Sequence, residues 1–299
     1  MLARGSFVRG TALALVLTTS LSTSTALPVG AATTPLAVSA DYSITARAMS
    51  AAGYGDMAVG RRFLAFDPAG DGRAVEVIGD LATARRIVIL VPGNDTTLRD
   101  FDRGLGGVAR RAPAVQARTV FDAVNRPVAR SDAGPDVRPD VAVVAWLGYD
   151  SPEGLGMAAI REERARAGAV ELQRFVGVLP VEATVVVVGH SYGSAVVGLA
   201  APGLGPAVTD LVALASPGMG VSGAAELGTG ARIWAGTSDR DWIRRVPHVK
   251  IAGFGHGADP TAPGFGARIL PTGNVSNHDS YLVPGSATLT ALVPIVVGG

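Results

Sequence analysis

A serine between two glycines, at the end of a run of valines, is the arrangement in this chain best suited to covalent chemistry. Ser191 lies within Gly189–Gly193, and Val185–Val188 come directly before it. Such glycines leave room for a sharp turn from strand to helix, which raises the serine hydroxyl above the edge of a sheet. The backbone N–H of Tyr192, at the start of the next helix, can then stabilise an oxyanion. An ordinary turn also uses glycines, but the valine run and the apolar Ala195–Val197 favour a nucleophile at Ser191.

A serine nucleophile needs a base, and histidine is the side chain that takes a proton near neutral pH. The chain has four histidines. His190 lies inside the turn, where its side chain should point away from Ser191, and His248 is expected at the start of a strand, at the wrong end of the sheet. His256 and His278 both lie further along the chain. The residues alone leave these two open as the base.

The base in turn needs a carboxylate, and the expected order along the chain is serine, acid, histidine. Asp239 and Asp241 both follow a predicted strand that ends at Ala235. Asp239 stands three residues after Gly236, whereas Asp241 begins an Asp-x-aliphatic pattern. One of the two should be a solvated charge, and spacing does not choose between them.

A second donor for the oxyanion is expected in the turn after the strand Arg86–Val91. The backbone N–H of Asn94 is the candidate, since Gly93 lets the chain come close to the serine. A plain turn built on Asn and Asp is the alternative.

The elements that must hold these groups are predicted by apolar runs. Continuous apolar strands are typical of a parallel sheet covered on both faces. The expected strands are 62–67, 74–78, 86–91, 141–146, 184–188, 211–215, 232–235 and 249–254. An apolar stripe at helical spacing predicts a helix over 158–178, and a final helix is expected over 287–293. This alternation indicates a doubly wound α/β sheet of about eight strands.

Two connections bear on the shape of the site. The link from Ala215 to Arg232 is short and rich in Gly and Ala, so no separate lid domain is expected. The roof of the site should come from the loops 147–157 and 255–277. The segment 126–140, with three prolines and scattered charge, is expected to be a solvated loop.

Composition narrows the class of protein. Residues 1–32 carry Arg4 and Arg9, then an apolar run over 11–21, then small residues, which predicts a secretory signal peptide. The run is shorter than the roughly 20 residues that a membrane span needs. The chain contains no cysteine, and its formal charge of +1 argues against nucleic acid as a partner. We expect a leader of uncertain structure over 33–60 and a single α/β domain over 61–299.

The motifs together resemble the secreted bacterial α/β-hydrolase family once filed as a domain of unknown function. The matching segments are Val91–Gly93 with Thr96–Thr97, Ala145–Asp150, Gly189–Ser194, Ser216–Gly218, Asp259–Pro260 with Phe265–Ala267, and His278-x-x-Tyr281 before Pro284–Ser286. The resemblance implies Ser191 as nucleophile, and places the family's Asp-x-aliphatic and His-x-x-Tyr motifs on Asp241 and His278. The family usually has Ser after the histidine, whereas this chain has Asp279.

These observations predict a secreted serine hydrolase that cleaves an ester or related acyl bond through an acyl-enzyme. Ser191, His278 and Asp241 would form the catalytic triad, with the N–H groups of Asn94 and Tyr192 as oxyanion hole. The chemistry needs no metal or cofactor, and the expected partner is a small or lipid-like acyl substrate, with no oligomeric state indicated. A peptidase or acyltransferase with the same triad, or a catalytically silent cell-envelope binding protein, are the alternatives.

Overall fold

The computed structural model describes residues 34–126, 140–180, 182–250 and 254–298. Every helix and strand in these residues lies within the unit Pro35–Gly299. The predicted signal peptide, 1–32, and nearly all of the predicted loop 126–140 lie outside the described residues. Of the helices that are described, none is long and apolar enough to cross a membrane.

The described strands form one sheet of eight strands in the order β1-β2-β4-β3-β5-β6-β7-β8. Their bounds are β1 (Arg62–Asp67), β2 (Arg73–Ile78), β3 (Arg86–Val91), β4 (Val141–Leu147), β5 (Thr184–His190), β6 (Val208–Leu214), β7 (Arg232–Gly236) and β8 (Arg268–Ile269). The β1–β2 and β2–β4 pairs are antiparallel, and all other pairs are parallel. The prediction of a mostly parallel sheet of about eight strands is confirmed.

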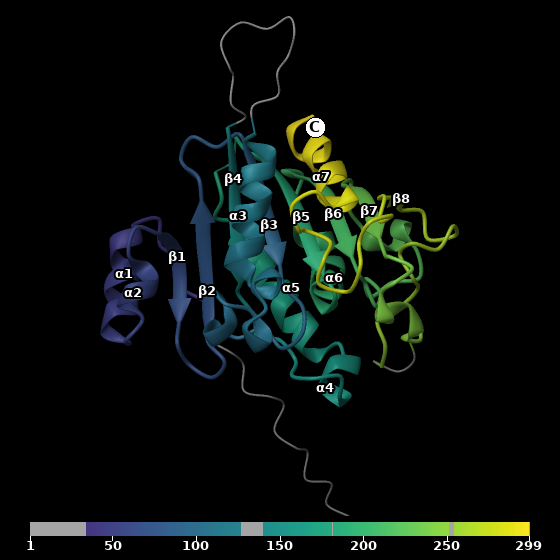
Figure 1. Ribbon diagram of the computed structural model, residues 1–299, viewed down its shortest axis with the longest axis horizontal. Coiled ribbons are helices and arrows are strands. Elements are labelled where there is room, and N and C mark those ends of the chain that lie inside the picture. Colours follow the sequence, from purple (N-terminus) through teal and green to yellow (C-terminus); the bar gives the residue numbers. More distant parts are fainter. Residues whose placement is uncertain (1–33, 127–139, 181, 251–253, 299) are drawn as a thin grey trace, which may run out of the picture. The chain divides into compact units, whose positions relative to one another are not determined.

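Helices cover both faces of this sheet, which explains why its central strands are apolar throughout (Figure 1). The helices are α1 (Tyr42–Ala51), α2 (Gly55–Ala58), α3 (Pro113–Val124), α4 (Met157–Ile160), α5 (Glu163–Val176), α6 (Tyr192–Ala200) and α7 (Ala287–Val297). Along β3, Ile87 and Ile89 pack into the apolar cluster formed with α5 and α6. Val88 and Leu90 point the other way, into the cluster formed with α3 and α7. Successive residues of one strand therefore stabilise two separate layers.

Several predicted elements differ from the observed ones. The helix expected over 158–178 is divided into α4 and α5, and the segment expected to be a leader of uncertain structure contains α1 and α2. The strand expected over 249–254 is wrong for its described residues: Val249 and Lys250 are irregular, and Phe254 makes only an isolated bridge. The last strand of the sheet is β8 instead. His248 therefore does not begin a strand.

The parallel strands bring their carboxyl ends to one edge of the sheet, where ligand sites of such sheets lie. Asn94 follows β3, Ser191 follows β5 and Asp241 follows β7. His278 comes from the long loop between β8 and α7. The fold thus gathers residues separated by up to 184 positions, from Asn94 to His278, along one edge.

Candidate active site

Ser191 occupies a strained turn between β5 and α6. Its backbone has φ 54° and ψ −128°, a conformation that residues with a Cβ rarely adopt. The flanking glycines make the turn possible. A Cβ at Gly189 would lie 2.6 Å from the Ser194 Cα, and one at Gly193 would collide with the carbonyl oxygen of Val91. The spacing of Gly-x-Ser-x-Gly is therefore required by contact with β3 and α6.

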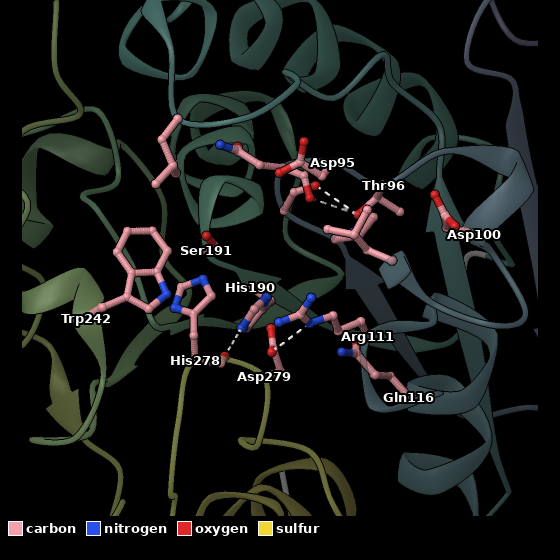
Figure 2. Close-up of a pocket in the computed structure, with 15 residues that line it drawn as sticks. Asp95, Thr96, Asp100, Arg111, Gln116, His190, Ser191, Trp242, His278 and Asp279 are labelled. Carbon is pink, nitrogen blue, oxygen red and sulfur yellow. Dashed lines mark hydrogen bonds and ion pairs between the residues drawn. The ribbon is translucent and has the colours of Figure 1, made fainter. Parts of the chain in front are cut away.

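The imidazole of His278 is oriented by Asp241. Its Nδ1 lies 2.9 Å from Oδ1 and 3.0 Å from Oδ2 of that carboxylate. Because a carboxylate accepts hydrogen bonds, Nδ1 carries the proton and Nε2 is the nitrogen left for another partner. Ser191 and His278 line the same cavity, and Figure 2 shows both side chains directed into it. The structure thus brings together the three side chains that the sequence singled out.

Asp241 is a buried carboxylate with several donors. Its Oδ1 accepts from the backbone N–H of Ile243 at 2.9 Å, and its Oδ2 accepts from the Tyr281 hydroxyl at 2.7 Å. Burial acts to raise the pKa of Asp241, but the hydrogen bonds and the charge of His278 outweigh burial and hold this pKa below its usual value. Asp241 is therefore ionised at neutral pH. The Tyr281 oxygen also accepts from the backbone N–H of Ser238 at 2.8 Å, which fixes the tyrosine.

Asp239, the other candidate acid, lies on the surface. Its side chain is 92% exposed and pairs with Arg244 at 2.9 Å. It is the solvated charge of the two.

The remaining histidines have other partners. His256 is buried, with its Nε2 2.7 Å from the carbonyl oxygen of Ala159, and burial lowers its pKa. The Nδ1 of His248 lies 3.1 Å from the carbonyl oxygen of Pro217. Neither ring has the hydrogen-bonded carboxylate that His278 has.

His190 precedes the serine and lines the cavity, but its ring is engaged elsewhere. Its Nε2 lies 2.7 Å from the carbonyl oxygen of His278, so this nitrogen carries a proton and donates. Burial, together with the nearby His278, lowers the pKa of His190 to about 4. A neutral His190 therefore supports the backbone of His278.

The two backbone donors expected to form an oxyanion hole flank the serine. Tyr192 begins α6, where the first N–H groups of a helix have no partner within it, and Asn94 lines the cavities on both sides of Ser191. A Cβ at Gly93 would lie 2.8 Å from the Ser191 Cβ and 3.3 Å from its Oγ. The turn after β3 therefore approaches the serine as closely as the sequence predicts.

Buried tyrosines hold this turn and the start of α6 in place. Tyr149 donates its hydroxyl to the carbonyl oxygen of Pro92 at 2.7 Å and stacks on Tyr192. The Tyr192 hydroxyl donates to the carbonyl oxygen of Arg161 at 2.9 Å and accepts from the N–H of Ala165 at 3.0 Å. Burial raises the pKa of Tyr192 to about 12, so this hydroxyl stays protonated. Both candidate oxyanion donors thus rest on rigid supports.

Two cavities meet at Ser191. The first, of about 290 Å³, has the more polar wall of the two and is hereafter called the polar cavity. Its charged and amide side chains are Asn94, Asp95, Asp100, Arg111, Gln116 and Asp279, and all but Asn94 are labelled in Figure 2. Arg111 donates from Nε to Asp279 at 2.7 Å. Within the described ranges, no three or more His, Cys, Asp or Glu side chains come together as metal ligands would.

The second cavity, of about 490 Å³, is hereafter called the apolar cavity. Its lining includes Ala159, Ile160, Tyr192, Val246, Val249 and Phe254. Asn94, Leu155, Ser191 and Trp242 line both cavities. The serine hydroxyl therefore stands at the junction of two chemically different spaces.

Sequence reasoning did not assign the parts played by Arg111, Trp242 and Tyr281. Tyr281 could have been found, because His-x-x-Tyr puts it one turn from the base. Arg111 lies 168 positions from Asp279, and no local pattern signals such a contact. The expected roof over 147–157 and 255–277 supplies Leu155, Gly255 and His256, while the segment 242–249 contributes more of the apolar wall.

Solved structures of several hydrolases resemble this chain at low sequence identity. One is a serine hydrolase from Xanthomonas campestris described as lacking a lid, with 15% identity and a TM-score of 0.42, covering 79% of this chain and 91% of its own. Another is Est1E from Butyrivibrio proteoclasticus, with 10% identity and a TM-score of 0.46, covering 80% of this chain and 100% of its own.

Comparison by sequence identifies the family. The family model described as alpha/beta hydrolase matches residues 67–251, and the chain belongs to this family. Among its relatives, Uncharacterized protein Rv2079 of Mycobacterium tuberculosis is 29% identical over 268 residues, which is 78% of this chain and 39% of that protein. Uncharacterized protein Rv0963c of the same species is 32% identical over 177 residues, which is 56% of this chain and 62% of that protein. The match thus spans less than two thirds of the length of either relative.

Proposed function

We propose that the protein is a secreted serine hydrolase that cleaves ester bonds through an acyl-enzyme. Ser191 is the nucleophile, His278 the base and Asp241 the acid that orients it. The backbone N–H groups of Asn94 and Tyr192 form the oxyanion hole. Secretion rests on the predicted signal peptide over residues 1–32.

The observation that carries this proposal is the contact between His278 and Asp241 beside a strained serine. The 2.9 Å hydrogen bond from Nδ1 leaves Nε2 of His278 to face the cavity that Ser191 also lines. Ser191 is one of three non-glycine residues with positive φ in the described part of the chain, and strain of this kind at a residue that lines a cavity favours a functional role. Structural ion pairs of histidine and aspartate are common, but they do not require such a serine beside them.

In the first half of the reaction, Oγ of Ser191 attacks the ester carbonyl carbon and its proton passes to Nε2 of His278. The carbonyl oxygen becomes an oxyanion between the two backbone N–H groups. When the tetrahedral intermediate collapses, the bond from carbon to the alcohol oxygen breaks and Nε2 returns its proton to that oxygen. The products are a free alcohol and an acyl group on Ser191.

In the second half, water takes the place of the alcohol. It attacks the acyl carbon while Nε2 of His278 accepts one of its protons, and the same proton then passes to Oγ as the acyl bond breaks. The carboxylic acid leaves and Ser191 is regenerated. Asp241 stays ionised throughout and stabilises the imidazolium, consistent with its lowered pKa.

A fluorophosphonate probe tests this function directly. The folded protein without its signal segment should become labelled and should hydrolyse p-nitrophenyl esters, and Ser191→Ala should lose both properties. Ser50→Ala, an exposed serine in α1, is the matched control and should retain them. A folded protein that is never labelled would support a binding protein instead, and faster turnover of peptide amides than of esters would support a peptidase.

A further inference from the structure

The two cavities that meet at Ser191 differ in chemistry, and this difference points to a class of substrate. We propose that the natural substrate is an ester of an apolar acyl chain with a neutral, hydroxyl-rich alcohol of the sugar type. The acyl chain occupies the apolar cavity and the alcohol occupies the polar cavity. This inference rests on the proposed function and specifies the substrate of that same site.

The position of the base decides which cavity takes which half of the ester. Nε2 of His278 must give its proton to the departing alcohol oxygen, so the alcohol has to lie on the side of the imidazole. His278 lines the polar cavity and is absent from the wall of the apolar one. The acyl chain therefore extends from the carbonyl carbon in the other direction, past Tyr192.

The polar cavity offers both acceptors and donors of hydrogen bonds. Asp95 accepts from the Gly154 N–H at 2.6 Å and Asp100 accepts from the Thr97 hydroxyl at 3.0 Å through one oxygen each. Each carboxylate has a second oxygen and further lone pairs. Such acceptors suit the hydroxyl groups of an alcohol.

The charges of this cavity argue for a neutral alcohol. Arg111 pairs with Asp279, and Arg103 lies 3.8 Å from Oδ1 of Asp100, so two of the three carboxylates are paired with arginines and Asp95 is the third. An alcohol that bears a carboxylate or phosphate would be repelled by these aspartates. A cationic alcohol would find Asp100 and Asp279 already paired with arginines, and a plain alkyl alcohol would leave the polar wall without partners. A polyhydroxy alcohol satisfies donors and acceptors together.

The apolar cavity has the opposite character. Five of the large apolar side chains exposed on the described surface line it: Leu155, Ile160, Trp242, Val249 and Phe254. Clustering of exposed apolar side chains around one cavity is the usual mark of an apolar ligand. An acyl chain placed there would remove these surfaces from water, which favours binding.

A panel of esters with one acyl group and different alcohols tests the proposal. Octanoyl esters of glucose, choline, glycolate and hexanol should be compared by kcat/KM on the protein without its signal segment. The glucose ester should be preferred by about tenfold or more, because a site built for hydroxyl groups penalises alcohols that leave its polar groups unpaired. A preference for the choline, glycolate or hexanol ester would overturn the assignment of the polar cavity.

Variants connect the preference to the two cavities. Asp100→Asn and Gln116→Leu should each lower the ratio of kcat/KM for the glucose ester to that for the hexanol ester. Asp56→Asn, an exposed aspartate of α2, is the matched control and should leave every ratio unchanged. If neither variant changes the ratio while both remain folded by circular dichroism, the polar cavity does not bind the alcohol.

The acyl assignment has a parallel test. Ala159→Phe should narrow the apolar cavity and lower the ratio of kcat/KM for p-nitrophenyl octanoate to that for p-nitrophenyl acetate. An unchanged or higher ratio would overturn it. Labelling by the fluorophosphonate separates the two proposals, since a labelled enzyme with a different preference contradicts only the substrate class, whereas an unlabelled protein contradicts the hydrolase itself.

Discussion

The ring of His190 donates a hydrogen bond of 2.7 Å from Nε2 to the backbone carbonyl oxygen of His278. The residue directly before Ser191 thus holds the segment that carries His278. Their rings lie 4.9 Å apart between centroids, so a second positive charge beside His278 would be unfavourable. Burial and this neighbouring charge keep His190 neutral, with a pKa of about 4.

The low pKa of His190 predicts a loss of stability in mild acid. In the unfolded chain its pKa is about 6.5. Between pH 6.5 and 4 the imidazole is therefore protonated in the unfolded state but neutral in the folded state. The free energy of unfolding is not reduced by this titration above pH 6.5, and it decreases by up to about 3 kcal/mol as the pH falls to 4. Urea unfolding at pH 7 and pH 4.5 should show a smaller decrease in His190→Gln than in the unmodified protein. Equal decreases would contradict a neutral His190 in the folded protein.

Asp241 and Asp239 form a matched pair for testing the acid. Asp241→Asn should lower kcat on p-nitrophenyl esters by about 10³–10⁴, because an amide no longer fixes the tautomer of His278 or stabilises the imidazolium. Asp239→Asn removes an exposed carboxylate that pairs with Arg244 and should leave kcat unchanged. Steady-state kinetics on both variants measures the two values of kcat. Equal decreases in kcat would contradict the assignment of Asp241 as the acid.

Substitution of Gly93 tests how much the proposed oxyanion hole depends on the close approach of the turn after β3 to Ser191. In Gly93→Ala the new Cβ would lie 2.8 Å from the Ser191 Cβ, so the turn or the serine must move. We expect a decrease in kcat of about 10²-fold, comparable to the loss of one oxyanion donor. Gly230→Ala, where a Cβ would meet nothing within 4 Å, is the control. Unchanged kcat in Gly93→Ala would exclude a role for this turn in the reaction.

The central strands and the strained serine could be predicted because their signals are local. The signals for the strand and for the turn that follows it lie within nine consecutive residues, Val185–Val188 and Gly189–Gly193. The start of the final helix is equally local, since the Ser286 hydroxyl, directly before α7, accepts from the N–H of Leu289. Where the physical cause lies within a few residues, the pattern is sufficient.

Elements whose cause lies elsewhere in the fold could not be predicted. The apolar residues around 249–254 were interpreted as a strand, but Val249 and Phe254 line the apolar cavity. The last strand, β8, consists of Arg268 and Ile269, which are both exposed, so it has no apolar pattern to detect. The pairing of Arg111 with Asp279 joins distant parts of the chain and follows only from the tertiary fold.

The proposed secretion predicts a defined mature N-terminus. Expressed in full in a bacterium with a secretory pathway, the chain should be cleaved after Ala26 or Ala31, since both follow small residues at the end of the apolar run. Leu15→Arg should interrupt that run and keep the protein in the cell, whereas Val38→Arg, beyond the cleavage sites, should not. Mass spectrometry of the exported protein identifies the site, and export with an intact Met1 would contradict a cleaved signal peptide.

Tyr281 is expected to position Asp241 without itself taking part in the chemical steps. Its hydroxyl donates to Asp241 at 2.7 Å and accepts from the Ser238 N–H at 2.8 Å, so Tyr281→Phe leaves the buried Ser238 N–H without this acceptor and removes one donor from Oδ2 of Asp241, which keeps its contact with His278. Leaving a buried group unsatisfied costs about 1–3 kcal/mol, which should appear as a lower free energy of unfolding. Because the tyrosine helps to hold Asp241 against His278, its loss should also lower kcat on p-nitrophenyl esters while leaving KM unchanged. A purely structural tyrosine would lower stability without changing kcat of the folded enzyme, and that outcome would contradict its role in positioning Asp241.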